Sequence, residues 1–390
     1  MLWKSVAILF LAVASYLCFW PTDLDPLPYE MDIDLGFTGV FSDNNLLGKS
    51  ERISIDGEGP EDIAISDEGW AYMGLQDGRI VRFSLTTGKQ EDYAHTQGRP
   101  LGLAFDHQGA LIVADAYKGL LRLKQKESIE VLATESDGVP FGFTDDVDVA
   151  PDGKIYFTDA SHKFSQARYK EDGFEHRPNG RLLVYDPKTN MTTTLLADLY
   201  FANGVAVSQN GEYLLFNETW KYRVQKYWLQ GPSKGKAEVL LDNLPGFPDG
   251  ISRGANGVYW LAVISPRSKI LDSLGPWPSL RKVVGRLPDF LQPAMEPYAG
   301  VFGLNGDGLV LYNFQDPEGR VFSNITSVEE KEGKLFLGSL VGDAFGNYDP
   351  QIRVGTKVKD RLKTPDSALL PQTAVLTAKR PLRSGVYLAP

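Results

Sequence analysis

A short unit of two apolar strands joined by a glycine turn recurs six times in this 390-residue chain. The turns end at Gly69, Gly109, Gly153, Gly211, Gly257 and Gly333. Glycine suits hairpin turns because it takes a positive φ at little cost. Repeats of about 40 residues built from strand hairpins are typical of β-propellers. We therefore predict an all-β, six-bladed β-propeller, and we expect residues 52–55 to complete the last blade and close the ring.

The N-terminal 20 residues are apolar, and Lys4 is their only charged residue. The 16 uncharged residues from Ser5 to Trp20 are many for a signal-peptide core and few for a spanning helix, which needs about 20. We favour an uncleaved signal-anchor over residues 1–20, which predicts a single-pass membrane protein with its propeller on the extracytoplasmic or lumenal side. A signal peptide cleaved near Ala12–Ala14 is the alternative, and it predicts a secreted protein.

The remaining chain divides into three parts. Residues 21–50 are expected to form a tether, residues 51–350 the propeller with an insertion at 265–300, and residues 351–390 a basic tail without an assigned function. Apolar residues recur at helical spacing in the insertion, among Arg281, Lys282 and Arg286. A basic amphipathic helix of this kind rests on a membrane, covers a pocket or packs on the side of the propeller.

The composition excludes several classes of function. Asp and Glu total 50 against 40 Lys and Arg, a net charge of −10, which argues against a nucleic-acid partner. The single cysteine, Cys18, lies in the N-terminal apolar segment. The rest of the chain therefore has no disulfides, zinc-thiolate sites or cysteine nucleophiles.

Polar side chains recur at one register of the repeat, eight residues before each turn glycine. The six residues there are Glu61, Leu101, Asp145, Asn203, Asp249 and Ile325. The inner strands of a propeller line its central channel, so equal registers lie at equal heights. Three carboxylates meeting in a channel need neutralisation, and Ca²⁺ accepts six to eight oxygen ligands, whereas zinc prefers His or Cys. We predict a Ca²⁺ site formed by the four oxygen-bearing residues.

A second pair of acids, Asp115 and Asp159, lies six residues after its turn glycines, and Asn217 has the same place in the fourth unit. They are interpreted either as a second polar layer, which would suit another ion, or as residues that bind the ends of strands. Among three N-x-S/T sequons, the one at Asn190 falls in an expected loop and is the best candidate for glycosylation.

Three segments carry a resemblance to a known superfamily: VADAYKGL at 113–120, DDVDVAPDGKIYFTDAS at 145–161 and LPGFPDGI at 244–251. The chain resembles the calcium-dependent six-bladed propellers, which include gluconolactonase, regucalcin, paraoxonase, diisopropylfluorophosphatase and strictosidine synthase, and it is most similar to the strictosidine-synthase-like branch. The resemblance implies a channel Ca²⁺ held by Glu61, Asp145, Asn203 and Asp249.

Two positions depart from the family pattern. Relatives commonly have Asn where this chain has Asp145, and an added carboxylate should bind the ion more tightly while reducing its Lewis acidity. Thr326 stands in the region of the strictosidine synthase catalytic glutamate. Without that acid, condensation of an amine with an aldehyde lacks its proton-transfer group, so we expect no strictosidine synthase activity.

Two functions follow as hypotheses. The first is a Ca²⁺-dependent hydrolase of small-molecule esters or lactones, of the arylesterase type, in which Asp249 or Glu61 acts as nucleophile or activates water. Aromatic residues near the blade starts then form an apolar mouth or pack between blades; they are Phe141, Phe143, Phe201 and Phe247. The second is a non-catalytic binding or scaffold propeller that Ca²⁺ stabilises.

Overall fold

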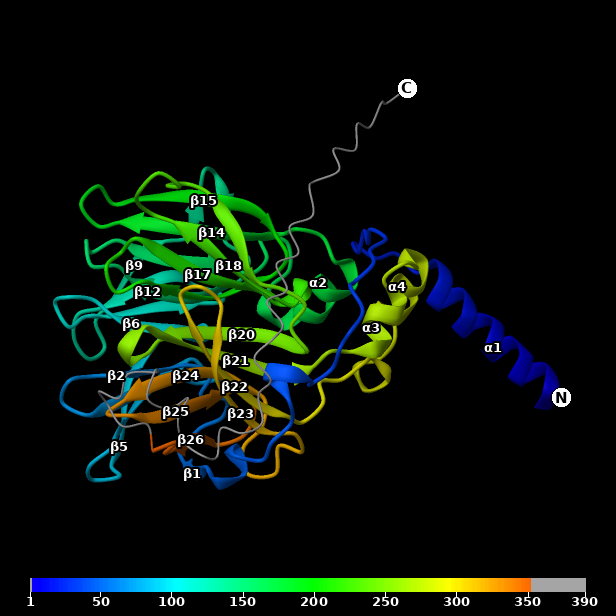
Figure 1. The fold of residues 1–390 in the computed structure, drawn as a ribbon. Coiled ribbons are helices and arrows are strands. Elements are labelled where there is room, and N and C mark those ends of the chain that lie inside the picture. The colour runs from blue at the N-terminus through cyan, green and yellow to red at the C-terminus, as the bar shows by residue number, and fades with distance from the viewer. Residues whose placement is uncertain (1, 352–390) are drawn as a thin grey trace. The chain divides into compact units, whose positions relative to one another are not determined.

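The computed structural model describes residues 2–351 and contains six four-stranded antiparallel sheets (Figure 1). The inner strand of every blade contacts the inner strands of both neighbouring blades, so the blades form a complete ring. The predicted six-bladed propeller is confirmed. The expected tail, residues 351–390, lies outside the described residues except for Gln351.

Each blade runs from an inner to an outer strand. From the first blade to the sixth, the strands are β2 (Ile63–Ile65), β3 (Trp70–Gly74), β4 (Arg79–Ser84) and β5 (Gln90–His95); β6 (Pro100–Phe105), β7 (Leu111–Asp115), β8 (Gly119–Leu123) and β9 (Ile129–Ala133); β12 (Thr144–Val149), β13 (Ile155–Asp159), β14 (Gly180–Asp186) and β15 (Met191–Leu199); β16 (Ala202–Val207), β17 (Tyr213–Glu218), β18 (Arg223–Trp228) and β19 (Ala237–Leu241); β20 (Gly246–Arg253), β21 (Val258–Pro266), β22 (Ala299–Asn305) and β23 (Val310–Asp316); and β24 (Ile325–Lys331), β25 (Lys334–Ser339), β26 (Ala344–Tyr348) and β1 (Glu51–Ser54). A small hairpin, β10 (Glu135–Ser136) and β11 (Val139–Pro140), precedes the third blade.

The ring is closed by the pairing of β1 with β26, in which Ile53 lies opposite Phe345. The strand that begins the propeller therefore forms the outer edge of its last blade, as residues 52–55 were predicted to do. The pairing also leaves the last blade with as many strands as the others.

The hydrophobic core lies between the blades. In one layer, Ile112 of the second blade packs with Val147 and Phe157 of the third. In another, Trp260 of the fifth blade packs with Leu337 of the sixth. Because neighbouring blades cover both faces of each sheet, strands in its interior such as β7 and β13 are buried along their whole length, whereas outer strands such as β9 are mostly exposed.

Glycines serve two different purposes in the ring. The six turn glycines all have positive φ, and at Gly109 a Cβ atom would meet nothing within 4 Å, so the backbone conformation is what requires glycine. At Gly102 of β6, a Cβ atom would lie 2.6 Å from the Cα of Asp146 in β12. Gly204 and Gly250 are equally close to the following blade. Glycine at these positions lets neighbouring inner strands approach at the channel.

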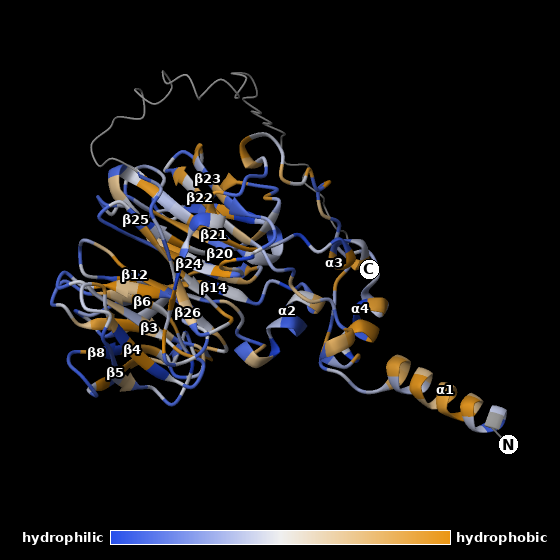
Figure 2. Ribbon diagram, turned by 90° about the horizontal axis from the view of Figure 1, so that it is seen from below, coloured by the Kyte–Doolittle hydropathy of each residue, from blue (hydrophilic) through white to orange (hydrophobic). Residues whose placement is uncertain are grey.

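The N-terminal segment forms the helix α1 (Leu2–Phe19). Figure 2 colours most of α1 as hydrophobic. Within residues 2–351, no helix has both the length and the apolar character needed to cross a bilayer, and the predicted signal-anchor stays unconfirmed.

Residues 21–50, which we expected to be a tether, lie against the propeller. Asp23 forms an ion pair with Arg168, and the Gln315 side-chain amide donates to the carbonyl of Phe41. The segment contains the short 3₁₀ turns η1 (Gly39–Phe41) and η2 (Leu47–Lys49). We call this segment the strap, since it is fixed to the surface at several points.

The insertion at 265–300 contains the helices α3 (Lys269–Leu274) and α4 (Pro278–Gly285) and the 3₁₀ turn η6 (Asp289–Leu291). The helix α4 packs against α2 (Tyr169–Glu175), which follows the turn η3 (Gln166–Arg168). The turns η4 (Thr219–Lys221) and η5 (Ala255–Gly257) lie in the fourth and fifth blades. Of the basic residues expected on an amphipathic helix, Arg281 is fully buried and donates to the carbonyl of Phe174. One side of α4 is therefore packed on the propeller, as one of the three interpretations predicted.

The two kinds of glycine predict different costs for the same substitution. Gly109→Ala should lower the free energy of unfolding by about 1–2 kcal/mol, because alanine at positive φ is strained. Gly102→Ala should cost more, because its Cβ meets the backbone of the next blade. Urea denaturation of both variants measures the two effects, and equal midpoints would contradict the proposed role of Gly102.

Candidate functional site

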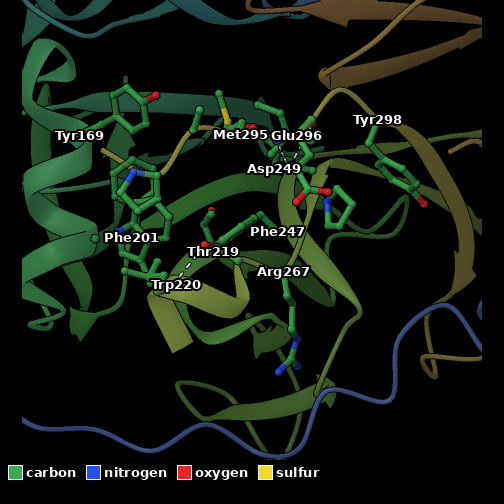
Figure 3. A pocket seen from close by; sticks show the side chains of 18 of the residues that line it. Tyr169, Phe201, Thr219, Trp220, Phe247, Asp249, Arg267, Met295, Glu296 and Tyr298 are labelled. Atoms are coloured by element: carbon green, nitrogen blue, oxygen red, sulfur yellow. Dashed lines mark hydrogen bonds between the residues drawn. The ribbon is translucent and has the colours of Figure 1, made fainter. Parts of the chain in front are cut away.

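All four predicted calcium ligands line one cavity of about 560 Å³ on the channel axis. Glu61, Asp145, Asn203 and Asp249 come from four different blades, and each is only 5–7 % exposed. Figure 3 shows Asp249 in this cavity, with Phe201, Trp220 and Phe247 also in its wall. Side chains up to 188 residues apart in the sequence are thus brought together by the common register of the blades.

A β-bulge at the start of the inner strands directs these side chains. The pairing of β12 with β13 shifts between Thr144 and Val147, and that of β16 with β17 between Ala202 and Val205. The pairing of β20 with β21 shifts in the same way, just before Ile251. Because a bulge adds an unpaired residue and re-aims its side chain, Asp145, Asn203 and Asp249 stand outside the regular ladder.

Burial and mutual repulsion raise the pKa values of the three acids. The pKa of Glu61 is well above its usual range, first because of burial and then because of Asp249 and Asp145. Burial followed by the charge of Asp249 does the same for Asp145. Burial raises the pKa of Asp249 to about 7, although a hydrogen bond with Asn203 opposes the shift. All three acids therefore gain from a nearby positive charge.

The donor set fits a hard divalent cation. It consists of carboxylate and amide oxygens, and the buried Oδ2 of Asp145 has no hydrogen-bond partner within the described structure. As the side chains are placed, however, residues 2–351 contain no group of three His, Cys, Asp or Glu side chains that could hold a metal ion.

The wall of the cavity is aromatic. Phe143 and Phe201 contact each other edge to face at 5.4 Å, and Phe247 lies beside Trp220. Phe141 does not line the cavity; it packs on Phe157 between blades, which was the alternative role for these residues.

Trp220 is a cavity residue that the sequence reasoning missed. Its indole N–H donates to Oδ1 of Asp172 at 2.9 Å, and burial raises the pKa of Asp172 to about 6. Trp220 follows β17 in the turn η4, outside the register of the repeat. The sequence held one signal for Trp220, which is its position three residues after Asn217, near the end of β17.

A second cavity, of about 320 Å³, shares Glu61, Asp145 and Asn203 with the first and lies along the inner strands. Its further acids were also missed. They are Asp62, Asp146, Asp148 and Glu329. The first three accept backbone N–H bonds from the next blade, at 2.7 Å from the nitrogens of Leu103, Val205 and Val207 respectively. The signal was present in the sequence, because Asp62 and Asp146 directly follow the predicted ligands Glu61 and Asp145.

Asp115 and Asp159 line neither cavity. Oδ1 of Asp115 accepts from the backbone N–H of Arg99 at 3.0 Å. Asp159 accepts from the N–H of Phe143 at 2.9 Å and forms a buried ion pair with Arg181 at 2.6 Å. Both side chains thus bind strand ends, which was one of the two interpretations given for them, and Asp159 also fixes the loop that carries Phe143.

Thr326, in the region of the family's catalytic glutamate, is fully buried. Its hydroxyl donates to the carbonyl oxygen of Glu61 at 2.5 Å, and the hydroxyl of Ser327 donates to the same oxygen at 2.9 Å. This position therefore joins the sixth blade to the first and presents no acid to the cavity.

The raised pKa values predict a stability that falls with pH when no cation is bound. The proton that Asp249 holds in the folded protein is released on unfolding, so its contribution to the free energy of unfolding is lost as the pH rises from about 4 to about 7, the pKa of Asp249. Asp249→Asn should make the fall between pH 5 and pH 8 shallower by about 1 kcal/mol or more, at about 1.4 kcal/mol per pKa unit. Urea midpoints measured in chelator check this, and identical slopes for both proteins would contradict it.

Comparison with known proteins agrees with this fold. The sequence model of the strictosidine synthase family matches residues 145–232, and that of the N-terminal part of strictosidine synthase-like proteins matches residues 39–83. Among solved structures, a gluconolactonase from Xanthomonas campestris has a TM-score of 0.56 at 16 % identity, over 84 % of this chain and 95 % of its own. A calcium-binding regucalcin from Agrobacterium tumefaciens has a TM-score of 0.53 at 14 % identity, over 76 % and 92 %.

Two relatives are much more similar in sequence. Strictosidine synthase-like protein 6 of Arabidopsis thaliana is 39 % identical over 288 residues, which cover 72 % of this chain and 76 % of the relative. The adipocyte plasma membrane-associated protein of Bos taurus is 34 % identical over 357 residues, which cover 85 % and 86 %. With this degree of identity over most of its length, the chain belongs to the strictosidine synthase-like family.

Proposed function

We propose that this propeller is a calcium-dependent hydrolase of small-molecule esters or lactones, of the arylesterase type. The observation that carries the proposal is a buried set of three carboxylates and one amide at the base of an aromatic cavity. The gluconolactonase name of a structural neighbour supports the reaction type, and the description of another as calcium-binding supports the ion.

The residues that would hold the cation are Glu61, Asp145, Asn203 and Asp249. Their oxygen donors suit Ca²⁺, and the unpartnered Oδ2 of Asp145 is a ligand that no hydrogen bond competes for. When bound, the ion would polarise the carbonyl group of the substrate and stabilise the oxyanion that develops on it.

Asp249 is the group best suited to move the proton. Its carboxylate would be kept ionised by the bound cation and is able to take a proton from water as the water oxygen bonds to the carbonyl carbon. It then returns the proton to the leaving alkoxide when the ester bond breaks. Its hydrogen bond with Asn203 orients the carboxyl group. Direct nucleophilic attack by Asp249 or Glu61 remains the other route.

The aromatic wall selects the substrate and excludes water. Phe143, Phe201, Phe247 and Trp220 present an apolar surface above the carboxylates, which suits an aryl or acyl group. The hydrogen bond from Trp220 to Asp172 fixes the orientation of that ring. Condensation of an amine with an aldehyde is not expected, because Thr326 supplies no acid and its hydroxyl is committed to the backbone.

A non-catalytic, calcium-stabilised scaffold is the second candidate function. Asp145, where relatives commonly have Asn, favours it, because an extra carboxylate binds the ion more tightly and weakens it as a Lewis acid. In that case the ion contributes only stability, and the cavity binds a ligand without turnover.

We also propose that the protein associates with a membrane through α1, without nucleic acid as a partner. The name of the Bos taurus relative, a plasma membrane-associated protein, supports the association. The single membrane pass with an extracytoplasmic or lumenal propeller, and the secreted alternative, remain predictions.

Hydrolysis of aryl esters and lactones by the purified full-length protein tests the reaction. We expect turnover that chelator abolishes and added Ca²⁺ restores, and a loss of 100-fold or more in kcat for Asp249→Asn. The matched control is Asp316→Asn, since Asp316 is fully buried but lines neither cavity. Turnover that survives complete removal of the metal would overturn the proposed chemistry. Ca²⁺-dependent stability without turnover of any ester or lactone would favour the scaffold.

Asn190 offers a test of the compartment. It is exposed in the turn between β14 and β15, whereas the sequon residues Asn217 and Asn324 are buried. If the propeller enters a secretory lumen, the protein made in eukaryotic cells should lose one glycan on treatment with an amidase for N-glycans. Asn190→Gln should migrate like the treated protein. A single glycan that persists in this variant would show that another site is used.

A further inference from the structure

Exposed apolar side chains lie on the insertion, whose Ile270 also lines the cavity of about 560 Å³, here called the upper cavity. The insertion lines the cavity with Ile270 and Met295, and it also carries large apolar side chains that face solvent. These are Ile270 in α3, Trp277 and Leu280 near and in α4, and Phe290 and Leu291 in η6. Phe290 is 83 % exposed and Trp277 is 60 % exposed. We call these five residues the apolar rim.

The strap ties α1 to this same face. Asp23 is bound by Arg168 at 2.7 Å and Asp25 by Arg177 at 2.5 Å, while the buried Arg281 donates to the carbonyl of Leu27. Tyr29 stacks on His176 with a ring separation of 3.6 Å. Since α1 ends at Phe19, only three residues lie between the helix and its first attachment.

A direct contact also joins α1 to the insertion. The guanidinium of Arg286, just after α4, donates to the carbonyl of Leu17 at 2.8 Å. Figure 2 shows α1, α3 and α4 on the same side of the propeller, with apolar colour along α1 and α4. The strap itself adds exposed Ile33 and Leu35 beside the cavity residue Asp34.

Large apolar side chains are exposed around α1, and this favours burial of the helix in an apolar medium. Among the described residues, however, no helix, α1 included, has the length and apolar character that a helix crossing a bilayer needs. Attachment to a membrane is stable when two contacts combine, such as an apolar segment and a basic apolar face. The rim lies among Lys269, Lys282 and Arg286, for which the described residues show no ion pair with a carboxylate. These cations favour anionic lipid headgroups.

We propose that the apolar rim docks on the surface of a phospholipid bilayer that contains anionic lipids, with the mouth of the upper cavity toward the lipid. In combination with the proposed function, on which this extension rests, the substrate class is an amphiphilic ester or lactone that enters from the membrane. The apolar part of such a molecule would cross from the lipid to the rim and then to Phe201, Phe247 and Trp220.

Fluorescence of the full chain in vesicles tests the docking without any need for turnover. In a Cys18→Ser background, Phe290→Cys is labelled with a polarity-sensitive dye. The protein is reconstituted in phosphatidylcholine vesicles that contain roughly 30 % phosphatidylserine as the anionic lipid. The emission should shift to the blue, and lipids with a nitroxide group near the headgroup should quench it at least twofold. The matched control is Asp152→Cys, on the exposed turn after β12 at the opposite end of the channel.

A further, double variant tests the part that charge plays in the docking. Lys269→Glu combined with Lys282→Glu should reduce the quenching at residue 290, while α1 still binds the vesicles. Equal quenching at residues 290 and 152, or a label at 290 that stays in water, would overturn the proposal. A blue shift that appears without vesicles and grows with protein concentration would also overturn it, since a second copy would then cover the rim. Because the measurement reports lipid contact, it can succeed even if no ester is hydrolysed.

Discussion

The pairing of β1 with β26 is the constraint on which the arrangement of the site depends. It joins the two ends of the propeller, so the inner strands of the first and last blades are held next to each other. Glu61 lies just before the first inner strand, and its carbonyl accepts from Thr326 of the last. Loss of this closure would therefore release one of the four proposed ligands from the others, although β1 itself is the strand farthest from the channel.

The buried acids of the channel fall into two groups with different physical roles. Asp62, Asp146 and Asp148 accept backbone N–H bonds from the next blade, and these bonds oppose the cost of burial while joining inner strands. Burial and neighbouring acids raise the pKa values of Asp146 and Asp145 alike, but one oxygen of Asp145 has no partner in the described structure. The unpartnered oxygen of Asp145 therefore supports the proposed cation site.

The sequence predicted those features that depend on local chemistry repeated in every blade. Glycine turns mark each hairpin, and a fixed spacing from them located Glu61, Asp145, Asn203 and Asp249. The bulges were not predictable, because they arise where an inner strand meets both its own blade and the next one. Trp220 was missed for a related reason: its place in the cavity depends on Asp172 of the preceding blade, a partner 48 residues away.

The N-terminal segment shows how strongly context decides structure. Residues 21–50 begin with a proline-rich stretch and have little periodicity, which predicted a tether. In the structure, arginines from two distant parts of the chain bind this segment, namely Arg168 and Arg177 on either side of α2 and Arg281 in α4. Charged and backbone groups that sequence analysis assigns to solvent thus become fixed attachments. Since the strap also lines the cavity with Asp34 and Phe37, the segment that leads to α1 is part of the site rather than a spacer from it.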